Sequence, residues 1–471
     1  MPTGFRPTLP PPPMIADPAE RIRLAVSLKH QGALESAESV LKELAAAPDA
    51  PAVALTEYGR FLVETNRPGE AIGILGHSLR LNPDQADAHN DLGAALMAVG
   101  RLAESETHFA QAAAMSPEMA LIHDNLGNVR YRRQRFAEAI EAFGRTLALE
   151  PARPSAHLGM GMSLLASGRL AEGWRHYGRR FDLPDLAGLM PPPPGVPRWH
   201  GEPLKGKSIV VIPEQGFGDE IMCVRYAATL RDLGAARVTW LCSGTLKELF
   251  QRVKGISETR PKETPGSPDH DYFTYALELP ALCGAGVETI PAALPYLRED
   301  PAKGRPWKST FRSPGLHVGL VWKGSPTHKN DARRSIPSLL TLAPLWRVPG
   351  VSYVSLQKGT GHIGADTAHL PLKNPGPLLA SFSDTAAIVA HLDLVICVDT
   401  AVAHLAAALG KPVWVLLPFE LIDWRWIEGR DDSPWYPGVM RLFRQGEDEP
   451  WESVVERVTR ALEAHVAQRQ S

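Results

Sequence analysis

Residues 393–418 read DLVICVDTAVAHLAAALGKPVWVLLP, and this stretch decides the fold. A short apolar run ends in a polar turn, a helical run follows, and a second apolar run begins after Gly410 and Pro412. Glycine and proline at such positions end a helix and fix the start of the next element. The pattern therefore predicts strand, turn, helix, turn, strand, which is the building unit of a parallel sheet covered by helices.

The same alternation runs through the chain from residue 208 onward. It predicts doubly wound parallel sheets that are covered on both faces. A break near 298–314 separates two Rossmann-like halves, 208–312 and 313–445, which we expect to face a cleft and to hold a ligand at the carboxyl ends of their strands. The expected strands are SIVVIP (208–213), RVTWLCS (237–243) and YFTYALELP (272–280) in the first half, and HVGLVW (317–322), VSYVSLQ (351–357), DLVICVD (393–399) and PVWVLL (412–417) in the second.

The closing segment, 446–471, contains the amphipathic run WESVVERVTRALEAHVAQ (451–468). This run predicts a final helix that crosses back onto the first half.

The first third of the chain repeats itself every 34 residues. In such a repeat, small residues let two helices approach, an aromatic side chain fills the gap, and proline ends the second helix. The period predicts an α-solenoid of about five helix–turn–helix units over 18–184, whose concave surface holds a protein or peptide. The alternative is that the units only cap and stabilise the second part of the chain. The repeating registers are Gly59, Gly93, Gly127 and Gly161; Leu75, Phe109, Phe143 and Tyr177; Ala71, Ser105, Ala139 and Gly173; and Pro83, Pro117 and Pro151.

Two Pro-rich segments flank these repeats. Residues 1–17 predict a disordered arm. Residues 185–207 include four consecutive prolines, which favour a stiff extended linker, and Trp199 is placed to anchor this linker on the domain that follows.

Composition excludes several classes of function. The 471 residues carry a net charge of -2, which argues against nucleic acid as a partner. The four cysteines lie far apart, so we expect neither a disulfide framework nor a metal site, and a reducing cytoplasm fits. No run of 18 apolar residues occurs, so no membrane span is expected.

Two loops bear polar residues at strand ends. In PEQGFGDEI (213–221), Gly216, Gly218 and Asp219 fall between a strand and a helix expected over 220–234. The glycines permit the turn and Asp219 caps the helix, or else the carboxylate faces a reacting group. In the second loop, Asp399 and Thr400 end a strand, and Ala401 opens a helix whose free N–H groups suit a diphosphate. His404 follows in the first turn, where a hydrogen-bonded structural role is the simpler interpretation.

These stretches resemble known families. Residues 120–151 resemble tetratricopeptide (TPR) repeats, and VDTAVAHLAAALGKPVW resembles glycosyltransferase family 9, the lipopolysaccharide heptosyltransferases, which have the GT-B fold. The chain as a whole resembles TPR-containing bacterial glycosyltransferases, and its layout is similar to that of the O-GlcNAc transferases. The further segments that carry this resemblance are EQGFGDE, LVWKGSPTHKNDARRSIP (320–337), SLQKG (355–359) and DWRWIEGRDDSPWYPGVMRLFRQ (423–445).

The resemblance implies roles for single residues. Asp219 matches the general base of the heptosyltransferases, and Asp399, Thr400 and His404 match the donor-site motif. Arg334 stands where that family has a lysine, and an arginine can bind a diphosphate through two parallel hydrogen bonds. Further candidates are Lys323 and Lys358 for the phosphates, against an ordinary solvated surface, and Trp424 and Trp426 as a wall for the base or the acceptor, against a simple hydrophobic closure.

The expected reaction is an inverting, metal-independent hexosyl or heptosyl transfer from a nucleotide-diphospho-sugar to a hydroxyl, without a cofactor. Two alternatives remain open: a TPR adaptor whose GT-B part is inactive, and a transferase acting on a glycan or lipid-linked acceptor. A DxD-like run, Asp269-His270-Asp271, precedes an expected strand and is not assigned to metal binding.

Overall fold

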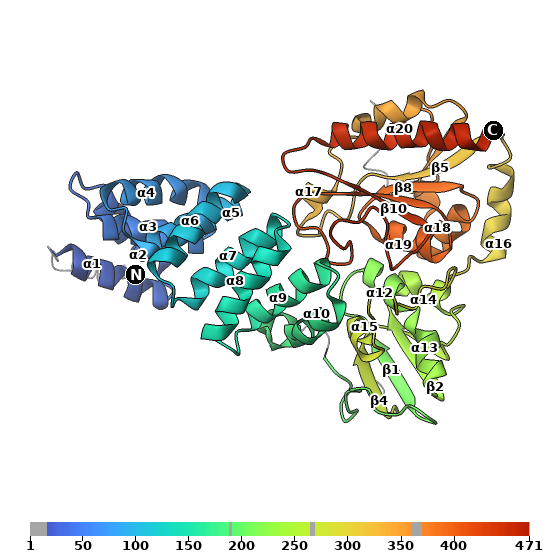
Figure 1. Cartoon of the computed structure of the whole chain (residues 1–471), viewed down its shortest axis with the longest axis horizontal. Helices are drawn as coiled ribbons and strands as arrows, with labels where there is room; N and C mark the ends of the chain where they lie inside the picture. Colours follow the sequence, from blue (N-terminus) through green and yellow to red (C-terminus); the bar gives the residue numbers. More distant parts are fainter. Residues whose placement is uncertain (1–16, 188–190, 264–268, 359–369, 471) are drawn as a thin grey trace, which may run out of the picture. The chain divides into compact units, whose positions relative to one another are not determined.

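A computed structural model describes residues 17–187, 191–263, 269–358 and 370–470 (Figure 1). The expected disordered arm, 1–17, lies outside these residues except for Asp17, which caps the first helix by accepting a hydrogen bond from the Ala19 N–H at 3.0 Å. The chain divides into two compact units, which are Met1–Arg130 with Glu141–Arg153, and Tyr131–Ile140 with Pro154–Ser471. The division therefore falls within the fourth helix pair.

Helix pairs form the first third of the described chain. Equivalent helices begin 34 residues apart, as the sequence period predicts, so the helical repeat region is confirmed. The helices of the five described pairs are α1 (Pro18–His30) and α2 (Leu34–Ala45), α3 (Ala52–Glu64) and α4 (Pro68–Leu81), α5 (Ala86–Ala98) and α6 (Leu102–Met115), α7 (Ala120–Arg132) and α8 (Phe136–Leu149), and α9 (Pro154–Ala166) and α10 (Leu170–Tyr177).

Each repeated glycine allows a close approach between the two helices of its pair. A Cβ atom added to Gly93 would lie 2.8 Å from the ring of Phe109, and one added to Gly127 would lie 2.7 Å from the ring of Phe143. Both rings are fully buried. These distances are too short for a real side chain, so the glycine and aromatic registers are two halves of one contact.

The first sheet of the second unit has four parallel strands in the order β3-β2-β1-β4. Residues 209–212 of the central strand are all buried, as expected for a sheet covered on both faces. The strands are β1 (Ser208–Ile212), β2 (Arg237–Cys242), β3 (Glu258–Pro261) and β4 (Tyr272–Tyr275), and the helices are α11 (Pro184–Ala187), α12 (Phe217–Cys223), α13 (Tyr226–Asp232), α14 (Gly244–Phe250) and α15 (Leu279–Leu282), with the 3-10 helices η1 (Gly178–Asp182) and η2 (Ala276–Glu278).

Three details of this sheet differ from the prediction. The strand expected over 272–280 ends at Tyr275. The Tyr275 N–H donates to the Glu278 carboxylate at 3.4 Å, and the chain turns into η2 instead of continuing the strand. The helix expected over 220–234 begins earlier, at Phe217, and is broken around Arg225, whose buried Nε donates to the Met222 carbonyl at 2.9 Å. Strand β3 was not predicted, because its sequence ETRP lacks an apolar run.

The second sheet has six parallel strands in the order β10-β9-β8-β5-β6-β7. The four strands expected in this part are present. The elements are β5 (Leu316–Val321), β6 (Val351–Ser355), β7 (Leu372–Lys373), β8 (Leu394–Val398), β9 (Val413–Leu417) and β10 (Met440–Arg444), with α16 (Pro301–Gly304), α17 (Asp331–Arg334), α18 (Phe382–Val389), α19 (Ala401–Ala408), α20 (Trp451–Gln470), and the 3-10 helices η3 (Arg305–Ser309), η4 (Leu339–Arg347) and η6 (Gly376–Leu378).

The last helix corrects one expectation. Helix α20 does not cross back onto the first sheet but packs against η4 and β10 (Figure 1). Its buried residues Val454, Val458 and Leu462 belong to the apolar cluster of the second sheet, together with Val318 and Leu394. The amphipathic pattern predicted the helix, but a pattern of this kind does not say which sheet will cover its apolar face.

Trp199 behaves as the sequence predicts. It is buried, its backbone N–H donates to the Phe273 carbonyl at 2.8 Å, and its indole N–H donates to the Glu202 carbonyl at 2.8 Å. The described part of the linker is thus attached to β4. No helix within the described ranges is both long and apolar enough to cross a membrane.

Candidate functional site

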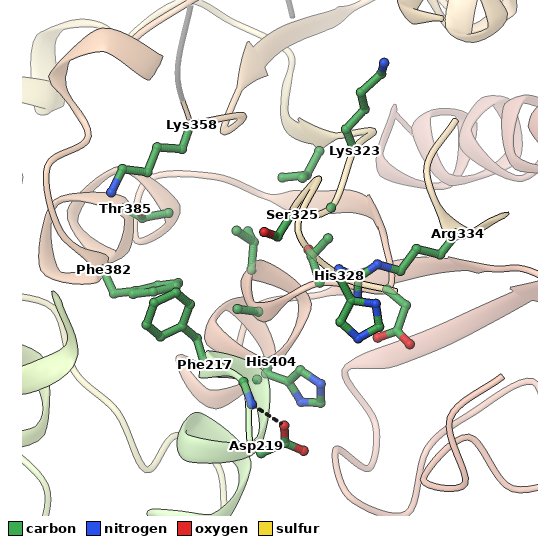
Figure 2. Close-up of a pocket in the computed structure, with 18 of the residues that line it drawn as sticks. Phe217, Asp219, Lys323, Ser325, His328, Arg334, Lys358, Phe382, Thr385 and His404 are labelled. Carbon is green, nitrogen blue, oxygen red and sulfur yellow. Dashed lines mark hydrogen bonds between the residues drawn. The ribbon is translucent and has the colours of Figure 1, made fainter. Parts of the chain in front are cut away.

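A pocket of about 660 Å³ lies in the second unit, at the carboxyl ends of strands from both sheets (Figure 2). The loop after β1 contributes from the first sheet, and the loops after β5, β6 and β8 contribute from the second. The predicted base and every predicted donor-binding residue line it, namely Asp219, Gly216, Gly218, Lys323, Arg334, Lys358, Asp399, Thr400, Ala401 and His404.

The two glycines of the first loop have different roles. Gly216 precedes α12, and its N–H donates to Asp219 Oδ2 at 3.0 Å, which orients the carboxylate at the first turn. A Cβ atom on Gly218 would lie 2.9 Å from the His404 ring. Only glycine therefore lets α12 pack on α19 at this point.

Asp219 forms a buried ion pair with Arg425, a residue that the sequence analysis did not identify. The guanidinium Nη2 donates to Asp219 Oδ1, and the side chain of Arg425 is only 5% exposed. Its Nε lies 2.9 Å from Asp423 Oδ1, and its carbon Cζ lies 5.2 Å from the centre of the Trp424 ring. Arg425 is thus held on several sides, so it fixes one oxygen of Asp219 in place.

Three carboxylates surround this arginine. Burial lowers the pKa of Arg425, but the nearby carboxylates hold this pKa well above its ordinary value. These carboxylates are Asp219, Asp423 and Asp399. Desolvation raises the pKa of Asp423 to about 6, and the carboxylates of Asp399 and Asp219 add to the rise while Arg425 opposes it. Carboxyl groups with raised pKa values are common in catalytic and binding sites.

The second loop forms as predicted. Thr400 is the N-cap of α19, and the first backbone N–H groups of the helix have no acceptor within it. Burial holds the pKa of His404 well below its ordinary value, with Arg425 next in effect. Arg425 can only donate, and its Nη1 lies 3.4 Å from His404 Nε2, so this ring nitrogen is an acceptor. The Nδ1–H of His404 therefore donates to the Tyr436 hydroxyl at 2.7 Å. His404 is therefore a neutral, hydrogen-bonded residue, which agrees with the simpler of its two interpretations.

Basic side chains occupy the opposite wall. Arg334 reaches into the pocket beside His328, whose pKa is lowered by burial and by Arg334 (Figure 2). A Cβ atom on Gly324 would lie 2.7 Å from Arg334 Nε, so the glycine leaves room for the Arg334 side chain in this position. The Lys358 amine donates to the Ala380 carbonyl at 3.4 Å, while the Lys323 side chain extends away from Asp219.

Two buried polar atoms in this wall lack hydrogen-bond partners. They are Thr400 Oγ1 and Arg334 Nε, the latter 3.6 Å from Asp331 Oδ1. Buried polar atoms in folded proteins nearly always have a partner. Both atoms belong to residues that line the pocket, and Thr400 is also the N-cap of α19.

Trp424 and Trp426 fit the hydrophobic closure rather than a wall for the base or the acceptor, because both are buried and neither lines the pocket. The ring of Trp424 packs edge-on against Trp174 at 5.2 Å between centroids. The indole N–H of Trp426 donates to Asp399 Oδ2 at 3.0 Å, and its ring stacks on His404. The polar residues of the same DWRW run, Asp423 and Arg425, line the pocket instead.

The DxD-like run lies at the other end of the first sheet. Asp271 accepts hydrogen bonds from the Ser208 N–H at the start of β1, and His270 is buried against Thr239. These residues stand at the amino ends of the strands, away from the pocket. Within the described residues, no group of three or more His, Cys, Asp or Glu side chains is placed to hold a metal ion.

Sequence comparison assigns families to two parts of this chain. Residues 59–120 and 125–177 match the family model of the tetratricopeptide repeat, and residues 379–416 match that of glycosyltransferase family 9 (heptosyltransferase). Protein FlbA of Caulobacter vibrioides is 32% identical over 297 residues. The match covers 57% of this chain and 48% of FlbA, so the chain spans about half the length of this curated relative.

Solved structures of the protein MamA are similar to part of the chain. A crystal structure of MamA is 20% identical, with 35% of this chain and 90% of MamA covered and a TM-score of 0.32. MamA from residue 41 to its end, from Desulfovibrio magneticus RS-1, is 19% identical, with 35% and 93% covered and a TM-score of 0.32. Scores this low carry no functional argument. The family matches confirm the resemblance that the motifs indicated, because one part of the chain is similar to glycosyltransferase family 9 and another to tetratricopeptide repeats.

Proposed function

We propose that the second unit is a GT-B glycosyltransferase, in which two Rossmann-like halves face a cleft, and that it moves a sugar from a nucleotide-diphospho-sugar to an acceptor hydroxyl. One observation carries the proposal: a single pocket at the carboxyl ends of both sheets brings together Asp219, the start of α19 and the basic side chain of Arg334. Ligands of open α/β sheets bind at such strand ends.

The donor diphosphate binds at the wall made by the second sheet. The free N–H groups at the start of α19 suit phosphate oxygens, because the helix end carries a partial positive charge. Arg334 Nε and Thr400 Oγ1, which are buried without partners, would each gain one. Lys323 and Lys358 supply further positive charge at the pocket margin, and the Gln357 side chain accepts from the Lys323 backbone N–H at 3.1 Å.

Asp219 acts as the general base. The acceptor oxygen attacks the anomeric carbon, the bond from that carbon to the phosphate oxygen breaks, the bonding electrons leave on the diphosphate, and the acceptor proton moves to Asp219. A carboxylate has about four lone-pair positions, so its bonds to the Gly216 N–H and to Arg425 leave room for one more. Attack from the face opposite the phosphate inverts the configuration. Arg334 and the helix end neutralise the leaving group, which makes the reaction independent of a metal ion.

The acceptor is a protein or peptide held by the repeats. Tetratricopeptide repeats build concave surfaces that suit extended partners. All four cysteines are free thiols, which fits a reducing compartment such as the cytoplasm, where nucleotide-sugars are available.

A thermal-shift series with UDP, GDP, ADP, CMP and dTDP tests the donor site. A ligand at a hundredfold excess over its Kd stabilises the folded state by about 2.7 kcal/mol. We expect one nucleotide to raise the melting temperature of the wild-type chain, Asp219→Asn to keep that shift, and Arg334→Ala to reduce it. A chain that none of these nucleotides stabilises would contradict the proposal.

A second candidate, a non-catalytic adaptor, is favoured by one observation: both oxygens of Asp219 already have partners in this structure. In that case the pocket binds a ligand without turning it over. Release of nucleoside diphosphate from the donor identified above separates the two. Turnover that Asp219→Asn abolishes supports the enzyme, and nucleotide binding with no turnover under any acceptor supports the adaptor.

A further inference from the structure

The last repeat helix, α10, contacts both loops that carry the charged pair of the pocket. Tyr177, the final residue of α10, is buried, and its hydroxyl accepts a hydrogen bond from Gln215 Nε2 at 3.1 Å. Gln215 lines the pocket and stands four residues before Asp219. Tyr177 therefore holds the loop of the proposed base.

The same tyrosine also touches the other loop. Its ring lies 5.9 Å from the ring of Trp424, between centroids, and Trp174 of the same helix packs edge-on against Trp424 at 5.2 Å. Trp424 directly precedes Arg425, the partner of Asp219. One helix thus fixes both ends of the ion pair.

A buried ion pair between Arg180 and Glu214 lies next to the hydrogen bond between Tyr177 and Gln215. Arg180, in η1, donates through Nε to Glu214 Oε1 at 2.9 Å, and the two side chains are 3% and 7% exposed. Glu214 Oε2 accepts from the Leu277 N–H at 2.8 Å, so the loop is tied to the first sheet as well. The Arg180 guanidinium also lies over the Tyr177 ring at 4.8 Å.

Tyr177 departs from its repeat register in a way that suits this role. The equivalent residues are Leu75, Phe109 and Phe143, which fill the gap between helices without a polar atom. A Cβ atom on Gly161 would lie 2.6 Å from the Tyr177 backbone nitrogen, so α9 fixes its backbone. Compared with these three residues, Tyr177 adds a hydroxyl group, and this hydroxyl accepts the hydrogen bond from Gln215.

We propose that Tyr177 is a positioning residue of the site and that α10 is a structural part of it. The inference rests on the proposed function for its catalytic meaning, since Tyr177 acts through Gln215 and Trp424 on Asp219 and Arg425. The last repeat would then not be an independent adaptor module, and removing it would cost the site its geometry.

The test is Tyr177→Phe in the full chain, with Tyr58→Phe as the matched control. Tyr58 is also buried in a repeat helix but does not line the pocket. Loss of one hydrogen bond corresponds to about a fivefold change in a rate or equilibrium. We expect backbone amides of residues 214–223 to exchange about fivefold faster in Tyr177→Phe and to be unchanged in the control.

Gln215→Met removes the same hydrogen bond from its other side. If the contact acts as described, the double variant exchanges no faster than either single variant. Additive effects, or protection unchanged in Tyr177→Phe, would overturn the inference.

Release of nucleoside diphosphate from UDP-, GDP-, ADP- and dTDP-glucose, with water as acceptor, gives the catalytic readout. We expect kcat to fall about fivefold in Tyr177→Phe while KM for the donor stays within about twofold, because the phosphate wall belongs to the second sheet. A change in KM alone would count against positioning. If the wild-type chain releases no nucleotide with water as acceptor, the test with other acceptors given above decides the proposed function, and amide exchange decides the role of Tyr177.

Discussion

Replacement of Asp423 by asparagine should stabilise the second unit at neutral pH. The pKa of Asp423 is raised from 3.8 to about 6 by desolvation, so the folded state binds this proton more tightly than the unfolded state does. Folding is then favoured by Asp423 below pH 3.8, and this contribution is lost as the pH rises through about 6.

The magnitude follows from the shift. A rise of about two pKa units corresponds to about 3 kcal/mol at a pH well above 6. The Asp423 side chain keeps 32% of its surface exposed in the pocket, however, and solvent screens a charge at such a site. Screening reduces the expected gain for Asp423→Asn to about 1–2 kcal/mol at pH 8, falling to nothing near pH 4. Asparagine still offers an oxygen to the Arg425 N–H, which donates to Asp423 at 3.0 Å.

Urea unfolding followed by tryptophan fluorescence is a suitable assay, because all 11 tryptophans lie at or after residue 174 and report the second unit only. Asp393→Asn is the matched control, with 30% of the side chain exposed. Although burial raises it, the His317 N–H and Arg469 lower the pKa of Asp393 overall, so its replacement should destabilise at pH 8. If Asp423→Asn instead lowered the urea midpoint at pH 8, the ion pair with Arg425 would outweigh desolvation and the reasoning would be refuted.

Two further substitutions test other parts of the structure. Arg425→Met leaves the surrounding carboxylates without their cation and should cost about 3–5 kcal/mol in the same urea assay, whereas Arg430→Met, which breaks an exposed pair with Asp432, should cost less than about 1 kcal/mol. Equal losses of stability would mean that burial does not make the Asp219–Arg425 pair more important to folding than the exposed Arg430–Asp432 pair. Gly93→Ala should destabilise the repeats by about 1–3 kcal/mol through overpacking on Phe109, as measured by thermal unfolding followed by circular dichroism of the helices. Gly76→Ala, whose nearest atom would be Arg80 Nη1 at 3.8 Å, should be neutral or stabilising by about 0.5–1 kcal/mol. A stabilising Gly93→Ala would remove the packing explanation of the repeat.

Local sequence signals predicted the parts of this fold that depend on neighbours in the chain. The 34-residue period located the helix pairs because each pair closes over a short turn, as Gly93 and Phe109 show. The central strands were visible as apolar runs because both of their faces are buried. Strand β10, MRLFR, has exposed and half-buried positions, so its pattern is weaker and it was missed.

The site residues were predictable where a strand end and a helix start fix their place. Asp219 and Thr400 stand at such points, and both line the pocket. Arg425 lies in a segment without regular structure, 206 residues after its partner Asp219, and no local pattern links two such positions. The DWRW run is a turn, in which the Trp426 N–H donates to the Asp423 carbonyl at 3.1 Å, so no strand or helix period relates its side chains. Within this turn, Asp423 and Arg425 line the pocket, whereas Trp424 and Trp426 do not.

The charges of the pocket explain why it should select a dianionic ligand. Asp219, Asp399 and Asp423 gather around Arg425, so this cation is already neutralised by carboxylates. Arg334 is paired more loosely, because its buried Nε has no hydrogen-bond partner and lies 3.6 Å from Asp331 Oδ1. In the proposed function, a diphosphate at Arg334 and the start of α19 would supply the partner that Arg334 Nε lacks, while the carboxylates of Asp219 and Asp423 would repel it. The same separation leaves the proposed base facing the acceptor rather than the leaving group, which is the arrangement that transfer with inversion requires.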